Sequence, residues 1–234
     1  MKINLSIKSF KQHIRERLYK RYNISFSKSG DDIQLHKLIK AKSPGIYVDI
    51  GCWHPTKASN TYYFYLRGWK GLCIDPNPEL KELYNKTRPN DSFLNFGVGN
   101  SEDLEYYMLE EPHSSMNTLN LDFLKKHNLT NKIKKTIIVP TYSLRQILDE
   151  SLTPNDRLDF FDVDVEGFDL EVLKTNDWNK YRPKVIIVES DMLLKKDITS
   201  PIVKYLESKN YKFIGKSIIM GDLGNLFLID QKQI

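Results

Sequence analysis

Several features that would place this chain in a special class are scarce or missing in its sequence. Of 234 residues only two are cysteines, Cys52 and Cys73, so a disulfide framework and a four-cysteine zinc site are excluded. No apolar run approaches the roughly 20 residues that span a bilayer. The N-terminal sequence MKINLSIKSFKQHIRERLYKRYN lacks the apolar segment of a secretory signal. We therefore expect a reduced, cytoplasmic protein.

The overall composition is that of an ordinary globular protein. Hydrophobic residues make up 40% and charged residues 28%, and we expect one domain over residues 1–234. Within it we predict a helical N-terminal extension, 1–42, and an insert for acceptor recognition, 101–142. Much of the net charge of +5 lies in the first 21 residues, which predict a basic amphipathic helix. Packing on its own domain is the commoner role of such a helix, and peripheral contact with an anionic membrane is the alternative.

Predicted strands and helices alternate along most of the chain. The apolar runs IYVDIG, GLCID, LDFFDVD and KVIIVES are each followed by a segment with helical patterning, such as SNTYYFYLRG over residues 59–68. The segment DSFLNFGVG, residues 91–99, holds the third predicted strand. This alternation predicts an α/β fold with a doubly wound, mostly parallel, seven-stranded sheet covered on both faces. The last two strands, YKFIGKS and NLFLID, are joined by a short connection and predict an antiparallel terminal hairpin.

Acidic residues follow the first two predicted strands. Asp49 and Gly51 form a D-x-G motif, and Asp75 ends the second strand, where an acid commonly binds ribose hydroxyls. These acids favour a nucleoside ligand. The loop GCWHPTKAS lacks the second and third glycines of a dinucleotide-binding loop, which argues against NAD and against a P-loop nucleotide. S-adenosylmethionine has no phosphate, and its sulfonium, ammonium and ribose suit acidic strand tips.

Three stretches together resemble the FkbM family of S-adenosylmethionine-dependent methyltransferases: YVDIGCWHPTKASNTYYFYLRGWKGLCIDPNP, LDFFDVDVEGFDLEVL and RPKVIIVES. The resemblance implies the class I methyltransferase (Rossmann-like) fold and methylation of oxygen on natural products or surface-glycan sugars. It further implies a role for each of eight residues. The methionine end of the cofactor would meet Asp49, Gly51, Asn60 and Thr61, the ribose Asp75 and Asn77, and the adenine edge Asn95 and Gly97.

The stretch DVDVEGFD, residues 162–169, ends a predicted strand in a run of acids. Alternate residues of a strand share a face, so these acids would repel one another unless a cation, a helix N-terminus or water offsets their charge. In a doubly wound sheet, the strand tips carrying His54, Asp164 and Glu189 should be neighbours. These three are candidate ligands of one divalent metal, Mg²⁺, Mn²⁺ or Fe²⁺. This layout is similar to metal-dependent O-methyltransferases such as catechol O-methyltransferase.

The same acids are candidates for catalysis. A sugar hydroxyl is a poor nucleophile while protonated, so we expect Asp164 or Glu166 to act on it, with Glu166 as the first candidate base and His113 as the second. Ser114 and Ser115 are candidates for binding acceptor hydroxyls. In the alternative interpretation, an acid here only favours the start of the following helix.

Two other functions compete with methyl transfer. A metal-dependent nuclease or phosphotransferase would also gather Asp164, Glu166 and Glu189 around a cation. A non-catalytic module attached to a membrane by its basic helix is the second rival. We favour methyl transfer, with a small-molecule acceptor rather than nucleic acid, and a nucleotide-linked sugar as the leading acceptor because a basic surface favours its diphosphate.

Overall fold

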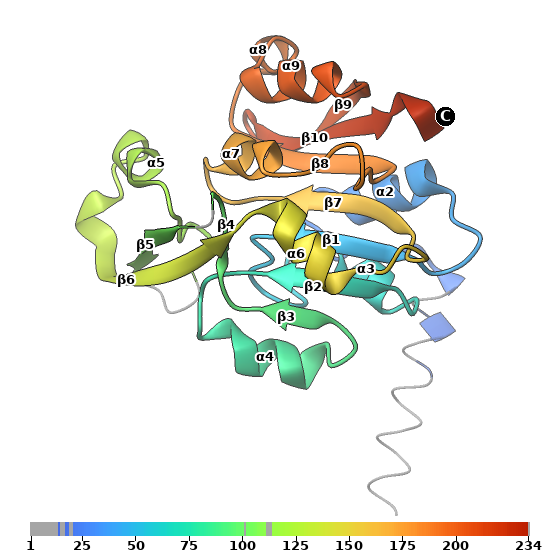
Figure 1. The fold of residues 1–234 in the computed structure, drawn as a ribbon, viewed down its shortest axis with the longest axis horizontal. Helices are drawn as coiled ribbons and strands as arrows, with labels where there is room; N and C mark the ends of the chain where they lie inside the picture. The colour runs from blue at the N-terminus through green and yellow to red at the C-terminus, as the bar shows by residue number, and fades with distance from the viewer. Residues whose placement is uncertain (1–13, 15–16, 19–20, 101, 111–113, 234) are drawn as a thin grey trace, which may run out of the picture.

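A computed structural model describes residues 14, 17, 18, 21–100, 102–110 and 114–233 (Figure 1). The predicted N-terminal amphipathic helix falls mostly outside these residues. The main sheet contains seven strands in the spatial order β3-β2-β1-β7-β8-β10-β9. Their bounds in that order are Ser92–Leu94, Lys70–Ile74, Ile46–Ile50, Leu158–Val163, Val185–Ser190, Leu223–Asp230 and Tyr211–Met220.

The sheet is parallel from β3 to β8 and ends in an antiparallel hairpin. Strand β1 pairs in parallel with β2 and with β7, whereas β10 runs antiparallel to both β8 and β9. This order confirms the predicted class I methyltransferase fold, including the placement of β7 between β1 and β8. The buried positions along β7 and β8 explain why their sequences read as continuous apolar runs.

Helices cover both faces of the main sheet (Figure 1). On one face, α2 (Asp31–Ile39), α3 (Tyr62–Tyr65) and α4 (Leu80–Thr87) bury an aromatic-rich core. On the other, α6 (Leu144–Ser151), α7 (Asp169–Lys174) and α9 (Pro201–Ser208) pack on an aliphatic core. The remaining helix of the sheet region, α8 (Leu194–Asp197), follows β8, and a short 3₁₀ turn, η2 (Gln231–Gln233), follows β10.

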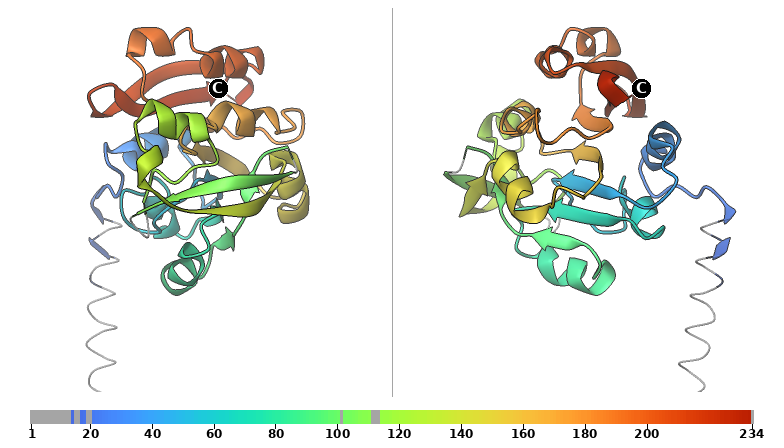
Figure 2. Two further views of the ribbon diagram at one scale, coloured as in Figure 1. Left: turned by 90° about the vertical axis from the view of Figure 1, so that its left-hand side faces the viewer. Right: turned by 45° about the vertical axis from the view of Figure 1, so that its right-hand side comes forward.

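The predicted insert, residues 101–142, supplies two of the three strands of a second, smaller sheet. Strands β4 (Gly97–Val98), β6 (Ile133–Tyr142) and β5 (Asp103–Leu109) pair in that order, and α5 (Leu121–Lys126) and η1 (Thr130–Lys132) connect β5 to β6. When the carboxyl-terminal edge of the main sheet faces the viewer, this sheet lies in front of it (Figure 2, left). The insert is therefore placed to cover the ends of β1, β2 and β7.

Two predicted elements differ from the observed ones. The helix expected over residues 59–68 is reduced to α3, because Ser59 Oγ accepts the amides of Thr61 and Tyr62 ahead of a four-residue helix. The third strand, expected within residues 91–99, splits into β3 and β4, because Gly97 and Val98 leave the main sheet to pair with β6. In the described part of the chain, no helix has the length and apolar character needed to cross a membrane.

Candidate active site

The carboxyl ends of the parallel strands open into a cleft with two adjoining hollows. The apolar hollow, of about 550 Å³, lies over β2 and β4 and is lined by side chains such as Ile74, Phe96 and Phe168. The acidic hollow, of about 590 Å³, lies over β1, β7 and β8. They share four lining residues, namely Gly51, Trp53, Ser115 and Asp164.

Asp75 occupies the apolar hollow at the tip of β2, as predicted. Its carboxylate accepts the backbone amides of Trp53 (3.0 Å) and Asn77 (2.9 Å). Burial raises the pKa of Asp75 to about 6, and the two amides oppose this shift. Asn77 also lines the hollow, with its side-chain oxygen accepting the amide of Glu79. The loop therefore fixes this carboxylate before any ligand arrives.

At both predicted glycines, Gly51 and Gly97, the close approach of neighbouring residues leaves no room for a Cβ atom. Gly51 has φ +79°, and a Cβ there would lie 1.8 Å from the carbonyl oxygen of Asp164, so the tips of β1 and β7 approach closely. Gly97 lines the apolar hollow, but a Cβ there would lie 2.9 Å from Thr141 Cγ2 of β6. Asn95, predicted to border adenine, instead donates to the carbonyl of Asp75 (2.9 Å), outside the lining of the hollow.

Asp49 lines the acidic hollow from the end of β1, paired in register with Asp162 of β7. Burial is the main cause that raises the pKa of Asp49 to about 6. Asn60 also lines this hollow and donates its side-chain amide to Asp162 (3.2 Å). Thr61, the other residue predicted to contact the methionine end, is fully buried, and its hydroxyl donates to Asp49 and supports that carboxylate.

A buried arginine that the sequence did not single out supports this loop from below. Arg88 follows α4, is 1% exposed, and forms an ion pair with Asp91 (2.6 Å). Its guanidinium also donates to Tyr47 Oη (2.6 Å), Thr61 Oγ1 (3.1 Å) and the Pro55 carbonyl (3.2 Å). Arg88 thus connects β1, the loop after β1 and the start of α3. The segment TRPND around it carries no recognised motif, so its sequence offers no signal for this role.

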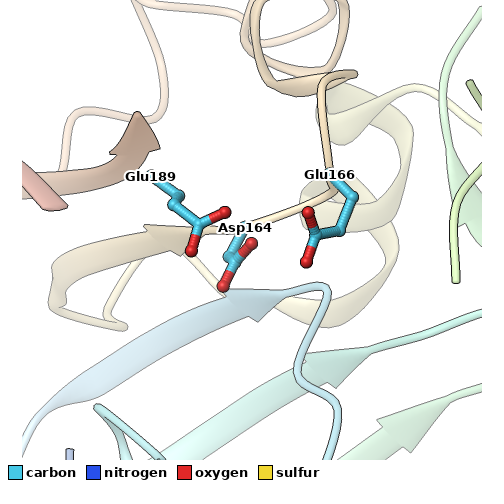
Figure 3. Close-up of side chains that lie close together, drawn as sticks. All are labelled: Asp164, Glu166 and Glu189. Carbon is cyan, nitrogen blue, oxygen red and sulfur yellow. The ribbon is translucent and has the colours of Figure 1, made fainter. Parts of the chain in front are cut away.

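Three carboxylates converge where the two hollows meet (Figure 3). Asp164 follows β7, Glu166 lies in the loop before α7, and Glu189 lies near the end of β8; one oxygen of each falls within 4.8 Å of the others. Each residue is half-buried. One oxygen of Asp164, Oδ1, is buried with no hydrogen-bond partner among the described residues. This cluster has the oxygen ligands that Mg²⁺ and Mn²⁺ prefer.

The environment of these acids opposes their ionisation. Burial, followed by the Asp164 charge, raises the pKa of Glu166 to about 10 and that of Glu189 to about 9. Burial also raises the pKa of Asp164. Lys28, which lines the acidic hollow, acts in the opposite direction on all three. Clustered acids with such shifts are typical of functional sites.

The backbone around Glu166 is held in an unusual conformation by the insert. Glu166 has φ 52°, in the left-handed region that side chains other than glycine seldom adopt. Thr118 donates its hydroxyl to the Glu166 carbonyl (3.0 Å), and Asn120 donates its side-chain amide to the Gly167 carbonyl (2.8 Å). The insert therefore fixes the loop that directs Glu166 toward Asp164.

The remaining predicted residues have mixed placements. Glu166, rather than the predicted His54, completes the group of possible metal ligands with Asp164 and Glu189. His54 lines the acidic hollow, but its Nδ1 accepts the amides of Thr56 and Lys57 (both 3.1 Å), which directs this nitrogen into its own loop. Ser114 and Ser115 line the apolar hollow, and Ser115 lines both. The predicted base His113 lies outside the described residues.

Aromatic side chains of the cleft were missed by the sequence interpretation. Trp53, with φ 40°, lines both hollows, while Phe96 and Tyr106 line the apolar hollow. Burial, and then the Asp75 charge, raises the pKa of Tyr106 well above its ordinary value. Tyr106 comes from β5 of the insert, so only the tertiary structure brings it to the tip of β2.

Comparison with protein-family models gives a match to the methyltransferase FkbM domain over residues 49–213. A search among curated proteins gives no match. The matched region includes the loop after β1, the four residues that line both hollows and the three clustered carboxylates. It leaves out the loop before α2, which contributes Lys28 to the acidic hollow.

Two solved structures to which the chain is similar are methyltransferases by description. A precorrin-6y C5,15-methyltransferase from Geobacter metallireducens is 12% identical, with 86% of each chain covered and a TM-score of 0.47. A TehB-like SAM-dependent methyltransferase from Corynebacterium glutamicum is 9% identical, covering 97% of this chain and 100% of that chain, with a TM-score of 0.45. Neither similarity bears on the acceptor.

Proposed function

The chain belongs to the FkbM family of S-adenosylmethionine-dependent methyltransferases, and on that premise we propose that it methylates a sugar hydroxyl. We propose a nucleotide-linked sugar or a surface-glycan precursor as the acceptor, with a divalent metal assisting. The observation that carries the proposal is the cluster of Asp164, Glu166 and Glu189. Asp164 lines both hollows, so the cluster lies at the point where the two hollows meet. A weakly acidic hydroxyl needs a group at this position to take up its proton.

The two hollows fit the two ends of the cofactor. S-adenosylmethionine supplies an electrophilic methyl group on a positively charged sulfur. The apolar side chains around Asp75 suit adenosine, and the fixed carboxylate of Asp75 can accept hydrogen bonds from ribose hydroxyls. Asp49 and Gly51 line the acidic hollow, where negative charge would favour the cationic ammonium group at the methionine end of the cofactor.

The carboxylate cluster fits a hard divalent cation. Three carboxylates offer oxygen ligands, and the unpartnered Asp164 Oδ1 is costly to bury unless something binds it. Asp164, Glu166 and Glu189 would hold the ion, which would lower the pKa of an acceptor hydroxyl bound to it. His54 is not needed for this set of ligands.

Glu166 is the residue we propose as general base. It lies in the cluster but outside the linings of the two hollows, on the loop that Thr118 and Asn120 fix. A cation bound by the cluster would favour the ionised form of Glu166, whose pKa is otherwise raised to about 10. One Glu166 oxygen would then hold the ion, and the other would accept the proton of an acceptor hydroxyl beside Asp164 as that hydroxyl oxygen attacks the methyl group in line with the sulfur. The family assignment favours this chemistry over the nuclease or phosphotransferase alternative.

Calorimetric titration with S-adenosylhomocysteine tests the proposal first. We expect micromolar binding by EDTA-treated protein, followed by transfer of a labelled methyl group to a nucleotide-sugar when Mg²⁺ or Mn²⁺ is present. Binding without transfer to any sugar would reject the acceptor class and keep the cofactor. Transfer that is equally fast in EDTA would reject metal assistance, and equal turnover of the free sugar would reject the nucleotide.

The remaining partner proposals are more general. We propose a small-molecule acceptor rather than nucleic acid, and peripheral membrane contact by the basic N-terminal segment. Replacing Arg15 and Arg17 by glutamate in the full chain should weaken binding to anionic vesicles if this segment makes the contact. Unchanged vesicle binding by that variant would remove the segment from the proposal.

A further inference from the structure

Five large apolar side chains are exposed at one corner of the molecule, on α8 and its flanks and at the end of β9. This apolar corner consists of Leu193 (52% exposed), Leu194 (49%), Ile198 (53%), Ile218 (53%) and Met220 (75%). Single exposed apolar side chains are ordinary, but a concentration of them marks a contact surface. In Figure 1, α8 and β9 lie at the top of the molecule.

A buried lysine joins the two parts of the corner. Lys216 of β9 donates to the Met192 carbonyl (2.6 Å) and forms a buried ion pair with Asp197 of α8 (2.8 Å). Lys216 also donates to the Asp222 carbonyl (2.6 Å), which holds the turn after β9 beside α8. The end of β9, with Ile218 and Met220, therefore lies near α8.

The charge around this surface is positive. Lys195 and Lys196 directly follow Leu193 and Leu194, and neither forms an ion pair with any residue that the structure describes. Asp197 binds Lys216 and Asp191 binds Lys126, whereas Asp222, two residues after Met220, forms no ion pair with any described residue. The corner therefore carries two unpaired lysines and one unpaired aspartate. A surface with two exposed leucines followed by two unpaired lysines complements a layer with an apolar interior and anionic headgroups.

The corner adjoins the mouth of the cleft. Gly224 of β10 pairs with Ser190, so the turn between β9 and β10 lies beside the end of β8 and Glu189. Ile219, between Ile218 and Met220, lines the acidic hollow. Whatever binds the corner is therefore held close to the candidate active site.

We propose that the apolar corner docks on the surface of an anionic lipid bilayer, with Leu193, Leu194 and Met220 entering the headgroup region and Lys195 and Lys196 meeting the phosphates. A second copy of the chain fits less well. A twofold contact centred on this corner would bring the lysines of α8 toward the same lysines of the other copy. This inference is independent of the sugar acceptor, because it concerns a surface outside the cleft.

Co-sedimentation of the full chain with vesicles tests the proposal. We expect the protein to partition to phosphatidylglycerol-containing vesicles and much less to pure phosphatidylcholine. The triple variant Leu193→Ser, Leu194→Ser, Met220→Ser should lose about tenfold or more of the partitioning, and Lys195→Glu with Lys196→Glu should lose it mainly on anionic vesicles. The matched control is Ile138→Ser, which removes a side chain that is 64% exposed on β6 and should change nothing.

Calorimetric binding of S-adenosylhomocysteine shows whether each variant is folded, and light scattering gives its mass. Unchanged partitioning of the folded triple variant would overturn the proposal, as would an equal loss in Ile138→Ser. A wild-type dimer that the triple substitution dissociates, without vesicle binding by either form, would assign the corner to a second copy instead.

Discussion

The carboxylates of the two hollows differ in whether the protein itself supplies their hydrogen-bond partners. In the apolar hollow, Asp75 receives two backbone amides from its own loop, so its acceptor atoms are positioned without a ligand. Where the hollows meet, Asp164, Glu166 and Glu189 face one another, and Asp164 Oδ1 has no hydrogen-bond partner in the described structure. The first arrangement is complete in itself, whereas the second requires a proton or a cation from outside the chain.

The largest expected effect comes from the clustered acids. Glu166→Gln keeps the shape of the side chain but removes the proposed base, so turnover should fall by roughly 10²–10⁴. Because Glu166 lines neither hollow, binding of S-adenosylhomocysteine should change by less than about threefold. Steady-state rates and calorimetry provide the two measurements.

Glu171→Gln is the matched control for this substitution, because it makes the same change on the exposed side of α7. It should leave both turnover and cofactor binding unchanged. Should Glu166→Gln retain full turnover, Glu166 is not the base and the contrast between the hollows has no catalytic meaning.

The support that Arg88 gives to the loop after β1 should account for the largest effect on stability. Arg88→Met removes one partner of a fully buried ion pair and leaves Asp91 without it, which should lower the free energy of unfolding by about 3–5 kcal/mol. Arg145→Met is the control, because the Arg145 side chain is 63% exposed and its pair with Asp149 should contribute about 1 kcal/mol or less. Urea unfolding compares the two, and equal losses would contradict the role given to Arg88.

Asp75→Asn should separate cofactor affinity from catalysis. The substitution removes the charge that would accept ribose hydroxyls, so affinity for S-adenosylhomocysteine should fall about ten- to a hundredfold. Turnover at saturating cofactor should change far less, the reverse of the Glu166→Gln result. A variant with unchanged affinity and a reduced rate would show that Asp75 does not hold the ribose.

The smallest expected effect is a dependence of stability on pH. The folded-state pKa of Asp49 is raised from 3.8 to about 6, so its protonated form favours the folded state. The resulting stabilisation is complete below the unfolded pKa and is lost as the pH rises through about 6. Between about pH 5 and about pH 7, wild type should therefore lose about 1 kcal/mol relative to Asp49→Asn. Denaturant unfolding at both pH values tests this, and a constant difference would mean that the pKa of Asp49 is not raised.

Much of the fold followed from the local pattern of the sequence. Apolar runs at the positions of β1, β2, β7 and β8 predicted strands, and their alternation with helices predicted the mostly parallel sheet. The pattern failed where neighbours outside the segment decided the structure. Residues 97–98 read as the end of strand three, but pairing with β6 takes them into another sheet.

For the site, the sequence by itself determined which strand tips carry acids and, through its motifs, the methyltransferase family. Tertiary structure alone decided that Thr61 supports Asp49, that Arg88 lies beneath the loop, and that Glu166 joins Asp164 and Glu189. The physical reason is that strand periodicity fixes only which face a side chain occupies. Contacts between distant segments, and a left-handed turn such as that at Glu166, fix which groups meet.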